Sequence, residues 1–146
     1  METDVALRQA VYSHFVSTGT APTVASLAGT LRLTIPDIAT ALQRLFARRL
    51  LVLSPDGEQI LMAPPFSGIP TQHRVLTGGR EYFANCAWDA LGVLAALQQD
   101  GLVRSRCEQT REALAIPVHA TGPESIPCVA HFAVPAALWW RDIVFT

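Results

Sequence analysis

A proline-rich segment at residues 63–72 constrains the fold of this 146-residue chain more than any other feature, since it holds three prolines and one glycine. Proline lacks a backbone N–H and disfavours helical geometry in the residue before it, so the segment should interrupt both helices and sheets. Before the segment, apolar residues recur at helical spacing, whereas after it one helical pattern is followed by short strand patterns. We therefore expect two modules, 1–62 and 73–146, joined by a connecting arm at 63–72.

The N-terminal module should contain three helices that each bury one apolar face. Thr23 and Thr34 precede the second and third helical patterns, and threonine is a favoured N-cap because its hydroxyl accepts a backbone N–H. Pro36 and Asp37 then fall in the first turn of the third helix, where both residue types are favourable. The three helices are predicted at 5–17, 23–31 and 34–49.

A β-hairpin should follow these helices. Two short apolar runs, 50–53 and 60–62, flank the sequence Ser54-Pro55-Asp56-Gly57, which is typical of a tight turn. Three helices followed by a hairpin is the order of a winged helix-turn-helix module. We therefore predict a winged helix-turn-helix-like domain for residues 1–62.

The charges on the third predicted helix bear on whether this module binds DNA. Arginine can contact phosphates, but Asp37 puts a negative charge at the helix end that normally approaches the bases. We interpret the module as packing on its partner domain, so DNA is not an expected partner, and keep a DNA-binding regulator as an alternative. The polar side of the helix carries Gln43, Arg44, Arg48 and Arg49.

The C-terminal module should combine one buried helix with a small mixed sheet, which makes the whole chain α+β. The helix is predicted at 82–97, and residues 135–140 should form a turn that leads into a last strand. Strands are predicted at 102–107, 113–118, 129–134 and from 143 onward.

Composition gives little sign of a membrane or nucleic-acid partner. Charged residues make up 16% of the chain, the formal net charge is −1, and no apolar run reaches the roughly 18 residues of a membrane span. The acidic start lacks the pattern of a signal peptide, so we expect a cytoplasmic protein. Its cysteines, Cys86, Cys107 and Cys128, should then be reduced thiols.

The segment around Cys86 carries the clearest chemical signal. Cys86 and Asp89 are three residues apart, which places both side chains on one face of a helix. A thiol near a helix N-terminus should be acidified, and a thiolate binds soft metals. An aspartic acid in apolar surroundings beside a thiolate should have a raised pKa and could deliver a proton. A soft thiolate and a poised acid suit protonolysis of a carbon–metal bond, although a buried free cysteine is usually just an inert small hydrophobe.

The segment 82–91, which reads Tyr-Phe-Ala-Asn-Cys-Ala-Trp-Asp-Ala-Leu, resembles the signature of the alkylmercury lyase (organomercurial lyase) family. Further similarity covers nearly the whole chain, namely the N-terminal helices and residues 64–71, 103–118, 131–135 and 139–146. The resemblance implies that Cys86 binds mercury and that Asp89 donates a proton to carbon and then receives mercury. It also implies a structural role for Cys107. The implied substrate is an organomercurial small molecule, cellular thiols would take up the product Hg(II), and no organic cofactor is implied.

The resemblance predicts a second active-site cysteine immediately after Phe145-Thr146, so we expect the domain at 73–146 to be shortened at its C-terminus. Cys128, and less readily Cys107, could serve as the second sulfur ligand for mercury. The main hypothesis is an alkylmercury lyase-like enzyme that releases a hydrocarbon and Hg(II). The alternative within the family is a non-catalytic relic that binds soft metal ions through its thiols.

Overall fold

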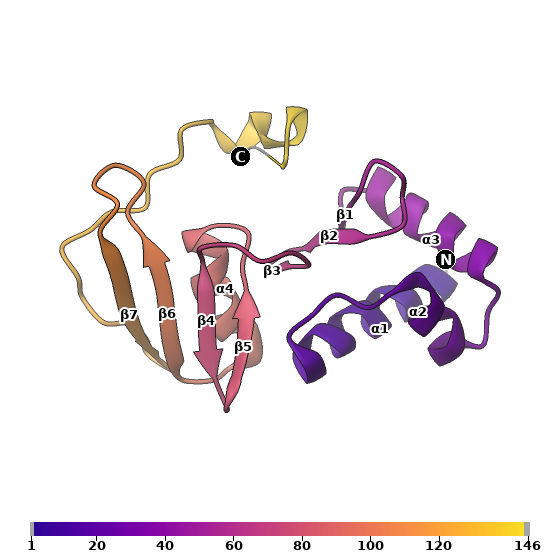
Figure 1. Cartoon of the computed structure of the whole chain (residues 1–146), viewed down its shortest axis with the longest axis horizontal. Coiled ribbons are helices and arrows are strands. Elements are labelled where there is room, and N and C mark those ends of the chain that lie inside the picture. Colours follow the sequence, from indigo (N-terminus) through magenta and orange to yellow (C-terminus); the bar gives the residue numbers. More distant parts are fainter. Residues whose placement is uncertain (1, 145–146) are drawn as a thin grey trace.

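The computed structural model describes residues 2–144 and places three helices before the first strand, as predicted (Figure 1). The Thr23 and Thr34 side chains cap the second and third helices by accepting the backbone N–H groups of Ser26 and Asp37. Both predicted N-caps are therefore confirmed. The helices are α1 (Glu2–Thr18), α2 (Val24–Leu31) and α3 (Ile35–Ala47).

The predicted hairpin is present, but the segment expected to be a connecting arm adds a third strand to it. The order in this antiparallel sheet is β1-β2-β3, and Ala63 pairs with Phe66. The prolines do not prevent this pairing, because Pro64 and Pro65 occupy the turn between two strands instead of the strands themselves. The strands are β1 (Val52–Leu53), β2 (Ile60–Ala63) and β3 (Phe66–Ser67).

The second sheet has the order β5-β4-β6-β7-β8, and every neighbouring pair in it is antiparallel. The fold class α+β is confirmed, whereas the expected mixed sheet is not found among residues 2–144. Tight turns such as Gly78-Gly79, where both glycines have positive φ, reverse the chain between neighbouring strands and so favour antiparallel pairing. The strands are β4 (Arg74–Thr77), β5 (Arg80–Phe83), β6 (Gly101–Arg106), β7 (Ala113–His119) and β8 (Gly122–Pro123).

The helix predicted at 82–97 begins later, because α4 spans Ala87–Leu97. Tyr82 and Phe83 belong to strand β5 instead, where they pair with β4. Helix α4 then packs on β4 and β6, so it covers one face of the five-stranded sheet.

The C-terminal segment departs most from the expectation. Residues 129–134, predicted as a strand, have no regular structure, and their large apolar side chains Val129 and Phe132 are exposed. Pro127 and Pro135 flank this segment and cannot donate backbone hydrogen bonds to a sheet. A 3-10 helix, η1 (Ala136–Arg141), replaces the expected turn, and residues 143 and 144 form a turn instead of a strand. The rest of that predicted strand lies outside the described residues.

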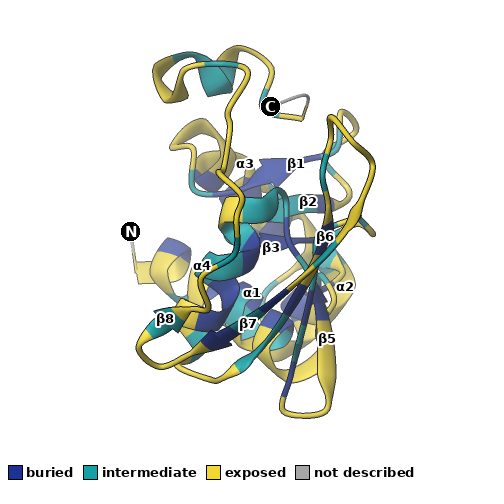
Figure 2. Cartoon of the chain, turned by 90° about the vertical axis from the view of Figure 1, so that its left-hand side faces the viewer, coloured by how far each residue is buried: buried dark blue, intermediate teal, exposed yellow. Residues whose placement is uncertain are grey.

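Buried residues, dark blue in Figure 2, occur in both predicted modules. Their apolar side chains form one cluster. Phe66 links the two parts of this cluster, because its ring stacks on that of Phe15 in α1 and also lies near that of Tyr82 in β5. The ring centroids are 5.3 Å and 5.7 Å apart, respectively. The Tyr82 hydroxyl also donates a hydrogen bond to the backbone oxygen of Val16 at 2.9 Å. The module boundaries remain a prediction, but the core continues across residues 63–72. Within residues 2–144, no helix is long and apolar enough to cross a membrane.

Candidate functional site

The turn between β5 and α4 sets the position of Cys86. The backbone of Ala84 is held on both sides, since its N–H donates to His73 O at 2.9 Å and its oxygen accepts from Thr71 Oγ1 at 2.6 Å. A β-bridge also joins Ala84 to Phe66. Cys86 follows in an extended conformation and is the N-cap of α4. The thiol is therefore carried on a well-anchored strand-to-helix turn.

Cys86 and Asp89 lie together at this helix start. The backbone N–H of Asp89 donates to Cys86 Sγ at 3.3 Å, as expected for an N-cap side chain. Burial raises the pKa of the Cys86 thiol, and the Asp89 N–H opposes this only in part. The prediction of an acidified thiol is therefore wrong in direction, because loss of solvation disfavours the thiolate more than the helix terminus favours it.

Asp89 is half-buried, and burial raises the pKa of its carboxyl group. The predicted direction is thus confirmed, and desolvation is its main cause. Asn85 opposes the shift, because its Nδ2 donates to Asp89 Oδ2 at 2.8 Å. Asp89 is therefore a carboxyl group poised to hold a proton at higher pH than an exposed aspartate would.

Asn85 was not predicted as part of the site. It is the only asparagine of the chain, and it directly precedes Cys86 in an otherwise apolar stretch, which is the one signal that could have identified it. Its side-chain oxygen is buried and has no hydrogen-bond partner. Buried polar atoms are nearly always paired, so this amide is an exception that needs a reason.

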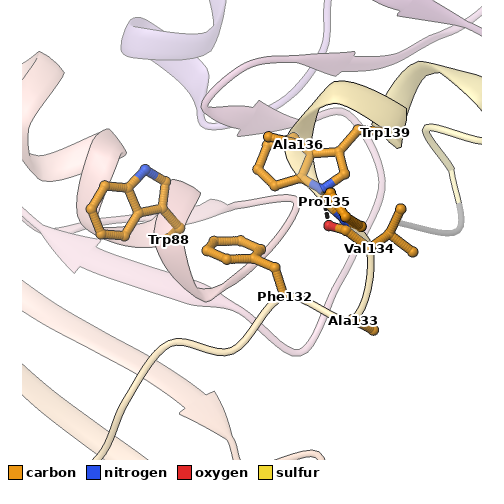
Figure 3. A pocket seen from close by; sticks show the side chains of 7 residues that line it. All are labelled: Trp88, Phe132, Ala133, Val134, Pro135, Ala136 and Trp139. Atoms are coloured by element: carbon orange, nitrogen blue, oxygen red, sulfur yellow. Dashed lines mark hydrogen bonds between the residues drawn. The ribbon is translucent and has the colours of Figure 1, made fainter.

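An apolar cavity of about 580 Å³ lies beside the start of α4 (Figure 3). Trp88, which stands between Cys86 and Asp89 in the chain, forms one wall, and this residue is 59% exposed. Phe132 and Trp139 face it from the C-terminal segment, with ring centroids 5.1 Å apart from each other. The complete lining is Trp88, Phe132, Ala133, Val134, Pro135, Ala136 and Trp139.

Neither of the other two cysteines belongs to a group of metal-binding side chains among the described residues. Cys128 is exposed in the C-terminal segment, and Cys107 lies in the turn after β6. A hydrogen bond from Thr110 lowers the pKa of Cys107. Among the residues that the structure describes, no group of three or more His, Cys, Asp or Glu side chains could hold a metal ion. The suggested role of Cys128 as a second sulfur ligand stays an untested prediction.

Two arginines, one on α3 and one just after it, make contacts within the molecule. Arg44 Nη2 lies 2.6 Å from Asp4 Oδ1, and this hydrogen bond lowers the pKa of Asp4. The Arg49 guanidinium lies over the Trp140 ring, 5.7 Å from its centroid. These two arginines are thus committed to intramolecular contacts, which favours a packing role for the module over DNA binding.

Comparisons with known proteins agree with the resemblance seen in the sequence. The sequence model described as alkylmercury lyase matches residues 66–146. Among solved structures, the mercury-bound form of MerB2 matches with a TM-score of 0.68 and 26% sequence identity over 86% of this chain. This chain spans 60% of the length of that structure. A search of curated protein sequences found no match.

Proposed function

This chain belongs to the alkylmercury lyase family, and from that membership we propose that it splits the carbon–mercury bond of organomercurial compounds. The observation that carries the proposal is the placement of Cys86 and Asp89 at the start of α4, where the Asp89 N–H contacts Cys86 Sγ at 3.3 Å. A soft sulfur for mercury and a carboxyl group for the proton are then neighbours, as protonolysis requires.

The first step would transfer mercury to sulfur. Because burial raises the pKa of Cys86, this residue is a thiol at neutral pH and must lose its proton when sulfur binds mercury. Sulfur would form the S–Hg bond, and the ligand that accompanied the organomercury would leave together with the thiol proton, so that Asp89 keeps its own proton. The raised pKa of Asp89 favours the protonated carboxyl group that the next step needs.

The second step would break the carbon–mercury bond. The electron pair of that bond would take the proton from Asp89, which forms the hydrocarbon, and the Asp89 carboxylate would then bind the mercury left on Cys86. Two molecules of a small thiol would finally remove Hg(II) as a dithiolate and return both protons to the site. We propose the cytoplasm as the location, because thiols are abundant and reduced there.

The apolar cavity beside Trp88 would receive the organic group of the substrate. Its aromatic walls suit a flat ring, which can gain apolar burial and ring stacking there. Replacing Trp88 with alanine should therefore raise KM for an arylmercury compound about tenfold, while KM for methylmercury changes little. Initial rates with both substrates would measure the difference, and an equal change for both would contradict this placement of the organic group.

Turnover of an arylmercury compound tests the proposed function directly. The reaction would be followed without oxygen and with excess small thiol, by measuring the released hydrocarbon. Wild-type protein should release hydrocarbon above the thiol-only blank, and Cys86→Ser should reduce release to the blank because oxygen is a poor ligand for mercury. Cys128→Ser is the companion variant: unchanged release would exclude exposed Cys128 as the second sulfur ligand, and lost release would support that role.

A non-catalytic soft-metal binder is the second candidate. It is favoured by the finding that, within residues 2–144, no third His, Cys, Asp or Glu joins Cys86 and Asp89 in a metal-binding group. Folded wild-type protein that binds Hg(II) through Cys86 but releases no hydrocarbon would support this candidate over the lyase.

A further inference from the structure

The side chain of Asn85 connects the carboxyl group of Asp89 to the segment that leads into β3. Its Nδ2 donates to Asp89 Oδ2 at 2.8 Å and also lies 3.4 Å from Phe66 O and 3.5 Å from Pro65 O. The bond to the carboxyl oxygen is the shortest of the three. The amide nitrogen thus lies between the Asp89 carboxyl group and two backbone oxygens of the segment that packs in the core.

The backbone on both sides of Asn85 is fixed. Ala84 is fully buried and hydrogen-bonded through its N–H and its oxygen, and Cys86 caps α4. Pro65 also packs near α4, because a side chain built on Gly92 would come within 3.3 Å of it. Asn85 therefore has little freedom to move away from Asp89.

In the side-chain amide of Asn85, only the NH₂ group makes hydrogen bonds, and the oxygen has none. This oxygen is buried without a partner, which lowers stability, whereas the nitrogen makes the contact to Asp89. A smaller apolar residue would avoid the unpaired oxygen but would also lose the donor. The position therefore favours an N–H donor aimed at Asp89 Oδ2.

We propose that Asn85 is a positioning residue that selects which oxygen of Asp89 carries the transferable proton; this inference rests on the proposed function. A carboxylic acid has one protonated oxygen, and an N–H donor can face only the other. The bond from Asn85 to Oδ2 therefore assigns the proton to Oδ1 and fixes the rotation of the carboxyl group. Oδ1 then delivers the proton to carbon, and the same fixed carboxylate afterwards receives mercury.

Kinetics of Asn85 variants test this assignment. Asn85→Ala should lower kcat about 10- to 100-fold with KM changed by less than about threefold, because misorientation affects the transfer step more than binding. Aspartate has nearly the same shape as asparagine but lacks the N–H donor, so Asn85→Asp should lower kcat by a similar factor. In an Asp89→Asn background, Asn85→Ala should cause no further loss. An additive loss, or a change confined to KM, would overturn the inference.

A second measurement does not depend on turnover. Since Asn85 is the only asparagine, labelling with ¹⁵N-asparagine gives one side-chain NH₂ group in an NMR spectrum. We expect the chemical shifts of this NH₂ group to differ between the wild type and Asp89→Ala. Adding one equivalent of Hg(II) should then change these shifts in the wild type but not in Asp89→Ala. Wild-type chemical shifts that do not change on addition of Hg(II) would overturn the inference. If the wild type fails to turn over substrate, the proposed function fails, and these signals still report whether Asn85 holds a mercury-binding carboxylate.

Discussion

Replacing Asp89 with asparagine should lower kcat by about 10²- to 10⁴-fold, the range expected when a general acid is removed. Asparagine has nearly the same shape, and its oxygen can still accept the hydrogen bond from Asn85, so the site should stay assembled. The asparagine amide, however, cannot deliver a proton to carbon. Release of hydrocarbon under excess thiol would measure the loss, with Asp100→Asn as a control on an exposed carboxylate.

The same substitution should change the pH dependence of turnover. Burial holds the pKa of Asp89 above its usual value, so protonated Asp89 is available up to a higher pH than for an exposed aspartate, and turnover limited by it should fall as pH rises through that pKa. Asp89→Asn should lack this descending limb. A variant that kept both the rate and the limb would show that another group supplies the proton.

Stability should not suffer from this substitution at neutral pH. Because the pKa of Asp89 is higher in the folded than in the unfolded chain, its stabilising effect is complete below the unfolded pKa and disappears as pH rises through the folded pKa. At pH above the folded pKa, the buried carboxylate is destabilising, and asparagine removes its charge. A thermal midpoint equal to or above that of the wild type would separate loss of activity from loss of fold.

Replacing Phe66 with alanine should lower the free energy of unfolding by about 3–5 kcal/mol, the range found for truncating a buried phenylalanine. Phe66 is 2% exposed, and its ring contacts aromatic side chains of α1 and β5. The cavity left behind would lie where the N-terminal helices meet the five-stranded sheet. Urea unfolding followed by tryptophan fluorescence and circular dichroism would measure the change.

Phe46→Ala provides the matched control, because Phe46 lies on α3 with 39% of its surface exposed and should contribute less than about 1 kcal/mol. Both probes should report one cooperative transition in the wild type, since the core continues across residues 63–72. Two separate transitions, or a small effect of Phe66→Ala, would instead indicate two independently folded modules.

Local signals in the sequence were enough to predict the N-terminal half. Apolar spacing predicted three helices, and the hydroxyls of Thr23 and Thr34 predicted where two of them begin. Both kinds of signal act over a few residues of one helix, so no distant partner has to be known. The turn signal at Ser54–Gly57 likewise predicted the hairpin of β1 and β2 that follows the three helices.

Strand pairing was harder to predict because it joins residues that are distant in the chain. Nothing near Tyr82 shows that it pairs with Val75 of β4, so the helical spacing of its neighbours led to a helix that begins five residues too early. The same reason explains β3, whose two residues form a strand only because β2 lies beside them.

The sequence by itself determined the chemistry of the candidate site, because the spacing of Cys86 and Asp89 suffices to bring a thiol and a carboxyl group to one helix start. Only the tertiary structure decided how these groups are tuned. Burial depends on every element packed around them, and it raised the pKa of the thiol that the helix terminus alone was expected to acidify. The contacts of Asn85 with the backbone oxygens of Pro65 and Phe66, and the placement of Phe132 and Trp139 opposite Trp88, likewise arise between separate elements, which spacing along one element cannot specify.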